Sequence, residues 1–186
     1  MLYWIKFQKK LELAMNEFAL IQKYFKKLTY NNPSALNLND DVFFDKKNNV
    51  VISSDTYVEG VHFLDFRKPD LVIKKILRSS ISDLYCKGVK PKFIFIGASG
   101  NKKSFSKKNL NLVYKSLNQE QKKYKIKLSG GDTTKSNKTT FTITCLGYSK
   151  KIVQRNKCKN NDDIYVTGNL GDCLLYTSPS PRDLWI

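Results

Sequence analysis

The sequence has few of the residues that build zinc sites and disulfide frameworks. It contains one histidine and four cysteines, and no two cysteines form a Cys-x-x-Cys pair. Structural zinc sites need several Cys or His ligands at short spacings, so the composition gives no support for one. The cysteines, which also form no disulfide-like pattern, are Cys86, Cys145, Cys158 and Cys173. Reduced thiols are the simplest interpretation, and they predict a cytoplasmic protein.

Long apolar runs and the common phosphate-binding motifs are missing as well. No run approaches roughly 18 to 20 residues, the length that crosses a bilayer, so no membrane partner is predicted. The chain starts Met-Leu-Tyr-Trp-Ile, with apolar residues ahead of the lysines, which is the reverse of a secretory signal. No Gly-x-x-x-x-Gly-Lys-Ser/Thr, His-Arg-Asp or Asp-Phe-Gly occurs, which excludes a P-loop enzyme and a protein kinase.

Arginine is scarce although the chain is strongly basic. The formal net charge is +17, and nearly all of the positive charge is lysine spread along the sequence. Proteins that read nucleic acid favour arginine for bidentate contacts, and here it occurs only at Arg67, Arg78, Arg155 and Arg182. The charge therefore favours a solvated surface with no specific nucleic-acid partner, and a basic nucleic-acid-binding module is the alternative.

The length of 186 residues suits one domain with a hydrophobic core. Amphipathic periodicity predicts a helix capped by Asn16, with Phe18, Ile21, Phe25 and Leu28 on one face. Further helices are expected from Pro69 to Gly88 and over 106–124. The first of these has a predicted buried face of Leu71, Val72, Ile76, Leu77, Ile81, Leu84 and Tyr85. A hairpin turn is expected at 45–49, and strands at 92–98, 126–128, 139–148 and 163–167.

A strand that begins at Val51 ends in a polar cluster. Ser53, Ser54 and Asp55 follow its apolar start, and His62, the single histidine, comes shortly after. Polar groups at a strand end are typical of a ligand site, although a turn or a helix cap is the commoner meaning. For His62 the alternative is a structural histidine held by hydrogen bonds.

Five acids lie at strand or helix ends or beside apolar faces: Asp40, Asp41, Asp55, Asp83 and Asp132. Converging carboxylates repel one another unless cations lie between them. Oxygen ligands favour magnesium over zinc. The turn Gly130-Gly131-Asp132 would let backbone amides approach a phosphate, although a hairpin turn is its commoner meaning. Together these residues predict magnesium-assisted phosphate transfer.

These motifs together resemble the thiamine-monophosphate kinase family. The resemblance runs from about residue 15 to residue 172. It rests on Asn-Glu-Phe-x-Leu-Ile, Asp-Asp, Ser-Ser-Asp-Thr-x-x-x-Gly-x-His-Phe, Ser-Asp-Leu-Tyr-x-x-Gly, Gly-Gly-Asp-Thr-Thr, an arginine, and Tyr-Val-Thr-Gly-x-Leu-Gly-Asp. It implies transfer of a phosphate from ATP to thiamine monophosphate, which gives thiamine diphosphate. It also implies the N-terminal domain of the aminoimidazole ribonucleotide synthetase-like fold, an α/β (α+β) domain with a mixed sheet and helices on one side, which forms a homodimer.

The resemblance also implies roles for single residues. Those matching the magnesium ligands are Asp41, Ser53, Ser54, Asp55, Asp83 and Asp132. His62 matches the contact with thiamine monophosphate. The positions matching the ATP contacts are Tyr114, Gly131, Asp132 and Arg155. Asn39 departs from the glycine usual before the Asp pair, which changes the turn there.

Both ends of the chain differ from the family pattern. Residues 1–14 precede a second methionine, Met15, and are interpreted as an upstream extension, with a longer first helix as the alternative. Residues 15–172 are predicted to form the ATP- and magnesium-binding domain. Residues 173–186 read as an artefactual tail where relatives continue into a C-terminal domain, so we expect a fragment with little or no kinase activity. Aminoimidazole ribonucleotide synthetase and selenophosphate synthetase, which use ATP in the same superfamily, are alternatives.

Overall fold

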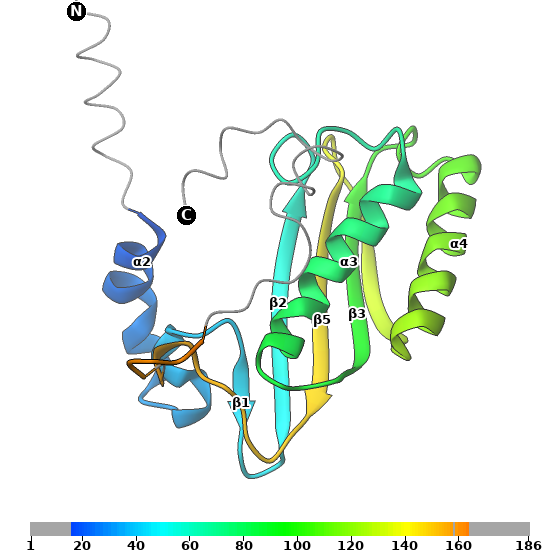
Figure 1. The fold of residues 1–186 in the computed structure, drawn as a ribbon. Coiled ribbons are helices and arrows are strands. Elements are labelled where there is room, and N and C mark those ends of the chain that lie inside the picture. The colour runs from blue at the N-terminus through cyan, green and yellow to red at the C-terminus, as the bar shows by residue number, and fades with distance from the viewer. Residues whose placement is uncertain (1–15, 158, 164–186) are drawn as a thin grey trace, which may run out of the picture.

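The computed structural model describes residues 16–157 and 159–163, and within them a five-stranded mixed sheet. The strands are β1 (Phe43–Asp45), β2 (Val50–Val58), β3 (Pro91–Gly100), β4 (Lys127–Lys135) and β5 (Thr140–Tyr148). Their order in the sheet is β1-β2-β5-β3-β4, with β5 antiparallel to both of its neighbours and β4 parallel to β3 (Figure 1).

Local side-chain chemistry forms the β1–β2 hairpin. The Asp45 carboxylate accepts hydrogen bonds from the backbone N–H groups of Lys47 and Asn48, and Asn49 has a φ of 58°. Asp and Asn tolerate such turn conformations because their short polar side chains bond to nearby backbone. The turn predicted at 45–49 is thus present, and it pairs Phe44 with Val51.

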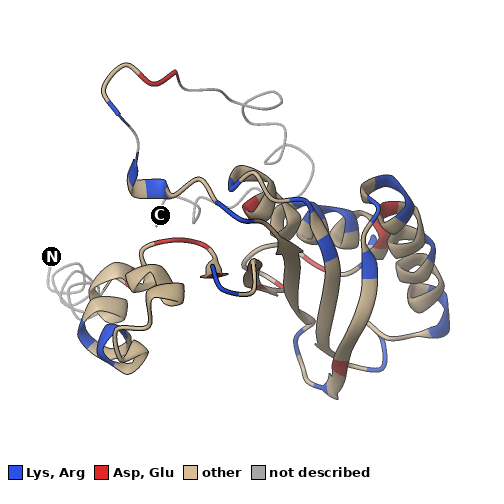
Figure 2. Cartoon of the chain, turned by 90° about the horizontal axis from the view of Figure 1, so that it is seen from below, with Lys and Arg blue, Asp and Glu red and all other residues tan. Residues whose placement is uncertain are grey.

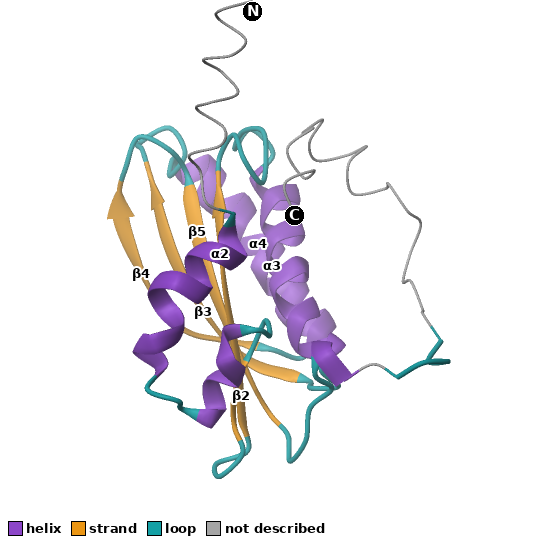
Figure 3. Cartoon of the chain, turned by 90° about the vertical axis from the view of Figure 1, so that its left-hand side faces the viewer, coloured by secondary structure: helices purple, strands orange, loops and turns teal. Residues whose placement is uncertain are grey.

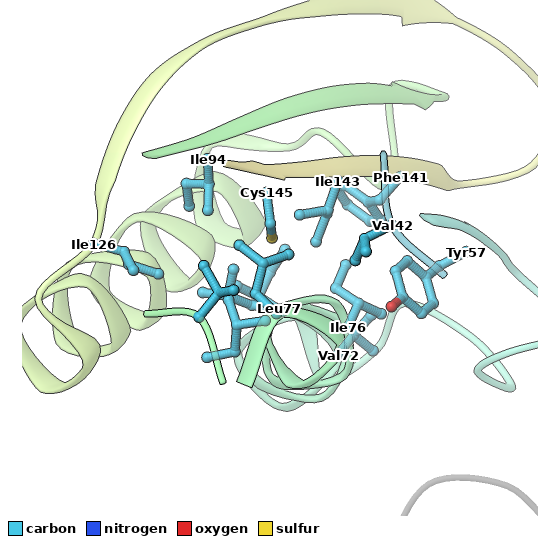
Figure 4. Packing of buried hydrophobic residues seen from close by; sticks show 14 of the residues in the cluster. Val42, Tyr57, Val72, Ile76, Leu77, Ile94, Ile126, Phe141, Ile143 and Cys145 are labelled. Atoms are coloured by element: carbon cyan, nitrogen blue, oxygen red, sulfur yellow. The ribbon is translucent and has the colours of Figure 1, made fainter. Parts of the chain in front are cut away.

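Helix α3 (Pro69–Cys86) covers the middle of the sheet. Its buried residues Val72, Ile76 and Leu77 point toward Ile94, Phe141, Ile143 and Cys145 of the sheet (Figure 4). The predicted buried face is largely correct, but Leu71 and Tyr85 are 42% and 43% exposed. Ile73 is buried instead, at 1% exposure. The stripe on α3 is therefore rotated toward Ile73.

Helix α4 (Lys107–Tyr124) packs beside α3, and both lie on one side of the sheet (Figure 3). Ser106 caps its start, because its hydroxyl accepts from the backbone N–H of Asn109. Two Arg78 nitrogens, Nε and Nη2, each donate at 2.7 Å to the Glu120 carboxylate, which is buried between the helices. This bidentate pair fixes the register of the two helices.

The other face of the sheet carries mostly hydroxyls and partly exposed apolar side chains. Along β5, Phe141, Ile143 and Cys145 are buried against the helices, whereas Thr142 and Thr144 alternate with them on the opposite face. All residues of β4 are exposed. We call the side of the sheet that the helices leave uncovered the open face. It carries the side chains of Ser54, Thr56, Phe95, Thr142 and Thr144.

The N-terminal segment is helical but not regular. Asn16 caps α2 (Glu17–Leu20) by accepting from the backbone N–H of Ala19 at 2.8 Å, as predicted. A π-helical turn (Ile21–Phe25) and a 3-10 turn (Lys26–Thr29) follow, and a second 3-10 segment spans Pro33–Leu38. Three side chains of the predicted stripe are exposed, namely Phe18 at 62%, Phe25 at 48% and Leu28 at 61%, and Ile21 is half-buried.

The predicted fold class, a mixed sheet with helices on one side, is confirmed. The strand expected at 163–167, apart from residue 163 itself, lies outside the described residues, as do the segments 1–14 and 173–186. No helix in the described part of the chain is long and apolar enough to cross a membrane.

Gly131 is required where β3 and β4 approach each other. It has a φ of 154°, and a Cβ on it would lie 2.0 Å from the Ile96 carbonyl oxygen. We expect Gly131→Ala to lower the free energy of unfolding by about 3 kcal/mol, because the strands must separate. Gly88→Ala is the control, since Gly88 has a φ of 73° with nothing within 4 Å of its Cβ, and it should cost about 1 kcal/mol. Urea unfolding measures both, and equal losses would contradict this role of Gly131.

Candidate cation and phosphate site

Acidic side chains from three separate elements meet beside the C-terminal end of α3. Asp40 and Asp41 lie just before β1, Asp55 lies on β2, and Asp83 lies in the last turn of α3. Side chains alternate along a strand, so Ser53 and Asp55 point to the helix-covered face of the sheet together. We call Asp40, Asp41, Asp55 and Asp83 the carboxylate cluster.

Asp83 shows how crowded this negative charge is. Burial, followed by the charges of Asp55 and Asp41, raises its pKa to about 7, and it shares a hydrogen bond with Asp55. The helix C-terminus adds a partial negative charge in the same place. Asp83 therefore gives up its proton less readily than an ordinary carboxyl, because it is partly buried and the neighbouring carboxylates repel a further negative charge.

Lys87 neutralises Asp40 within the cluster. Its Nζ lies 2.6 Å from Asp40 Oδ1, and the two side chains are 7% and 4% exposed. Burial alone would raise the pKa of Asp40, but the hydrogen bonds from Lys87 and from the backbone N–H of Arg155, together with the charge of Lys87, hold it below its usual value. A buried ion pair of this kind is costly to break, so it holds Asp40 and Lys87 in fixed positions at the base of the site.

Arg155 contacts the neighbouring acid. Its guanidinium forms an ion pair with Asp41, and its backbone N–H donates to Asp40 at 3.1 Å. Lys87 Nζ is also 3.7 Å from Asp41. The cluster thus has four carboxylates and only two cationic side chains. When all four carboxylates are deprotonated, two of their negative charges are not balanced.

The surrounding atoms suit a hard divalent cation. Ser53 Oγ is buried without a hydrogen-bond partner among the described residues, on the strand face that carries Asp55. On the neighbouring strand, Cys145 pairs with Ser53, and burial and the charges of Asp55 and Asp83 raise the pKa of its thiol to about 12, so the sulfur stays protonated. The donors that remain are oxygens, the ligands that magnesium prefers. Within the described ranges no three His, Cys, Asp or Glu side chains already converge on one point.

Tyr57 connects the cluster to the predicted substrate residue. Its buried hydroxyl donates to Asp55 Oδ2 at 3.3 Å and lies 2.8 Å from Ser80 Oγ. The Tyr57 ring meets the His62 ring edge-on, with centroids 5.7 Å apart. His62 Nδ1 accepts from the backbone N–H of Val58 at 3.0 Å, so its proton is on the exposed Nε2. Both interpretations of His62 thus have support, since one ring nitrogen is structural and the other can donate outward.

Other predicted residues lie away from the cluster. Ser54 bonds to Thr144 on the open face, so the side chains of Ser53 and Ser54 point in opposite directions. Asp132 on β4 is the strand partner of Gly97 on β3, and Gly97 is the strand partner of Thr142 on β5. Strand partners point to the same face of a sheet, so Asp132 also lies on the open face, next to Gly131. Tyr114 is 69% exposed on α4. The structure brings Asp41, Ser53, Asp55, Asp83 and Arg155 together. It separates them from the other predicted residues, which are Ser54, Tyr114, Gly131 and Asp132.

Comparison with known proteins identifies the family. The model of the family described as AIR synthase related protein, N-terminal domain, matches residues 38–149, which is more than half of the chain. The chain belongs to this family.

Curated relatives are named thiamine-monophosphate kinase. One from Buchnera aphidicola subsp. Schizaphis graminum is 37% identical over 172 residues, and one from Haemophilus influenzae is 32% identical over 166 residues. Each match covers 86% of this chain and 50% of the relative, so the chain spans about half the length of the curated relatives it matches. The resemblance inferred from the motifs is thus confirmed.

Solved structures support the fold. A structure described as AaThiL complexed with AMPPCP and TMP matches with a TM-score of 0.69 at 23% identity, over 79% of this chain and 48% of that chain. A thiamine monophosphate kinase from Aquifex aeolicus matches with a TM-score of 0.67 at 24% identity, over 80% and 46%. At these identities the likeness shows the fold of this AIR synthase related domain.

Sequence reasoning missed two residues of the site. Lys87 stands at an unspecified position of the Ser-Asp-Leu-Tyr-x-x-Gly motif, yet it follows Asp83 by four residues, a spacing that brings helical side chains together. Tyr57 likewise follows Asp55 by two residues, which places both side chains on one face of a strand. These spacings are common, so the sequence alone did not distinguish them.

The raised pKa of Asp83 predicts a pH dependence of stability. An unfolded Asp loses its proton near pH 4, whereas folded Asp83 keeps it up to about pH 7. Between these values the folded state binds more protons, so the contribution of Asp83 to stability decreases as the pH rises from about 4 to about 7. We expect Asp83→Asn to remove this decrease in urea unfolding measured across that range.

Asp65→Asn is the matched control for this prediction. Asp65 is held by Arg67, mainly through their hydrogen bond, and its pKa is lowered, so it contributes no decrease in that pH range. The control should keep the pH slope of the wild-type chain. A slope that survives in Asp83→Asn would show that the cluster does not hold this proton.

Proposed function

We propose that this domain forms the magnesium- and nucleotide-binding part of a thiamine-monophosphate kinase, which phosphorylates thiamine monophosphate with ATP. The observation that carries the proposal is the carboxylate cluster, where partly buried Asp83 lies close enough to Asp55 and Asp41 for their charges to raise its pKa. The names of the relatives at 30–37% identity support the same activity. The activity belongs to a longer protein, since the chain spans about half of those relatives.

Asp41, Asp55, Asp83 and Ser53 are the residues that would hold magnesium. Bound there, magnesium would neutralise phosphate oxygens that otherwise repel each other. The domain supplies the rigid frame: Lys87 fixes Asp40, and the Tyr57 hydroxyl holds one oxygen of Asp55. Fixed dipoles and charges of this kind promote phosphoryl transfer because they need no rearrangement during the reaction.

The remaining predicted contacts keep their roles as proposals. Exposed Nε2–H of His62 can donate to a phosphate of thiamine monophosphate. Gly131 and Asp132 would meet the nucleotide from the open face, and Tyr114 offers an exposed aromatic ring on α4. Ser54 and Asp132, also predicted as magnesium ligands, would have to act at a separate point from Ser53 and Asp55, since they lie on the other face. The predicted cytoplasmic location stays a prediction.

The open face supports the predicted homodimer. Phe95 on β3 is 38% exposed there and lies over Gly130, and Tyr148 at the end of β5 is 48% exposed. Hydroxyl pairs such as Thr56–Thr142 bond to each other at 2.9 Å and so need no water. A second copy of the same sheet would bury these apolar side chains against hydroxyls that are already paired.

Binding experiments test the proposed cation site directly. We expect Asp55→Asn to weaken magnesium binding to the chain by at least about tenfold, because it removes a charged ligand. Asp45→Asn, in the hairpin turn, is the control and should bind like the wild-type chain. Calorimetry with magnesium, and then with an ATP analogue in its presence, provides the measurement. Equal affinities in both variants would contradict the site.

Turnover distinguishes the related activities. The chain extended to the length of its relatives should form thiamine diphosphate, detected by chromatography. Magnesium-dependent nucleotide binding without this product would favour aminoimidazole ribonucleotide or selenophosphate synthetase chemistry. The basic-module alternative predicts steeply salt-dependent binding to any polyanion, but Lys and Arg are spread over helices, strands and loops (Figure 2).

The dimer proposal has its own test. Phe95→Glu should convert a dimer to a monomer in sedimentation or light scattering, because it places a charge inside the paired faces. Leu110→Glu is the control, since Leu110 on α4 is 46% exposed on the helix layer. A dimer that survives Phe95→Glu would place the interface elsewhere.

A further inference from the structure

Arg155 forms an ion pair with Asp41, one of the side chains proposed to hold the cation. It contacts Asp41 from 114 positions further along the chain. The Asp41 carboxylate therefore faces a guanidinium, although its charge also reaches Asp83 and raises the pKa of that side chain. No three acidic side chains among the described residues yet converge on one point. The arginine thus supplies positive charge in the arrangement seen here.

The two cationic side chains of the cluster differ in how firmly they are held. Lys87 and Asp40 are 7% and 4% exposed, whereas Arg155 and Asp41 are 53% and 38% exposed. Exposed ion pairs contribute little free energy, because water and salt screen them. The Arg155–Asp41 pair is therefore exchangeable, while the Lys87–Asp40 pair stays in place.

We propose that Arg155 exchanges partners: a divalent cation displaces it from Asp41, and the released guanidinium binds the anionic oxygens that accompany the cation. This inference rests on the proposed function, since it takes the carboxylate cluster as the cation site. The backbone N–H of Arg155 donates to Asp40 rather than to Asp41. This bond can persist during the exchange, and it keeps the arginine beside the site.

The exchange couples two binding events. The cation must compete with Arg155 for Asp41, so it binds less tightly alone than it would without the arginine. An anion that captures the released guanidinium removes this competition, because the planar arginine fork matches phosphate oxygens. Each ligand then increases the affinity for the other by the same factor. A purely structural arginine could compete with the cation, but it would not couple the binding of the cation to that of the anion.

The test compares magnesium affinity, by calorimetry on the 186-residue chain, in the wild type and in Arg155→Gln. We expect Arg155→Gln to bind magnesium alone about fivefold more tightly, because its competitor is gone. The variant should also lose most of the increase in affinity for inorganic pyrophosphate that magnesium gives the wild type. Arg155→Lys keeps the charge and should retain the competition.

Arg67→Gln is the matched control, since Arg67 pairs with Asp65 far from the cluster in an exposed pair. It should leave the magnesium affinity unchanged. Equal or weaker magnesium binding by Arg155→Gln, with wild-type binding still lost in Asp55→Asn, would overturn the exchange and leave the cation site standing. Magnesium binding that is indifferent to Asp55→Asn, or absent from every variant, would overturn both.

Discussion

Four carboxylates crowded around two cationic side chains are the constraint on which the rest of the site depends. Asp40, Asp41, Asp55 and Asp83 come from the approach to β1, from β2 and from the end of α3, so the fold itself forces them together. The buried Lys87–Asp40 pair fixes the base of the cluster, and a retained proton and Arg155 compensate for part of the remaining charge. A divalent cation bound there would neutralise the negative charge that remains.

The central strand β5 and helix α3 make this crowding possible. Ile143 and Cys145 of β5 pack against the apolar stripe of α3, and this contact aligns the end of the helix with Asp55 on β2. The Arg78–Glu120 pair then holds α4 against α3. The hydrophobic contacts thus position Asp83 in the cluster, and burial beside the same core makes its negative charge costly. The helices leave the open face uncovered.

Much of the fold could be predicted because its signals are local. The alternation in 139–148, the cap at Asn16, the helix over 106–124 and the Asp-Asn turn each depend on neighbouring residues. The separation of Ser53 from Ser54 also follows from strand geometry, yet motif matching grouped them. The cluster of Asp41, Asp55 and Asp83 was inferred from their chemistry, but the exposure of Leu71 and the pairing of Lys87 with Asp40 depend on how α3 sits on the sheet. No local pattern in the sequence indicates how α3 is rotated about its axis.

The most direct test of the central claim is the position of a bound divalent cation. Substoichiometric manganese, added to the 15N-labelled chain, broadens the amide signals of residues close to it. The cluster predicts that the signals of Ser53, Asp55, Asp83 and Cys145 disappear first, while those of Asp45 and Asp65 remain sharp. Broadening centred on those outlying acids, or spread evenly over the chain, would contradict a cation site at the end of α3.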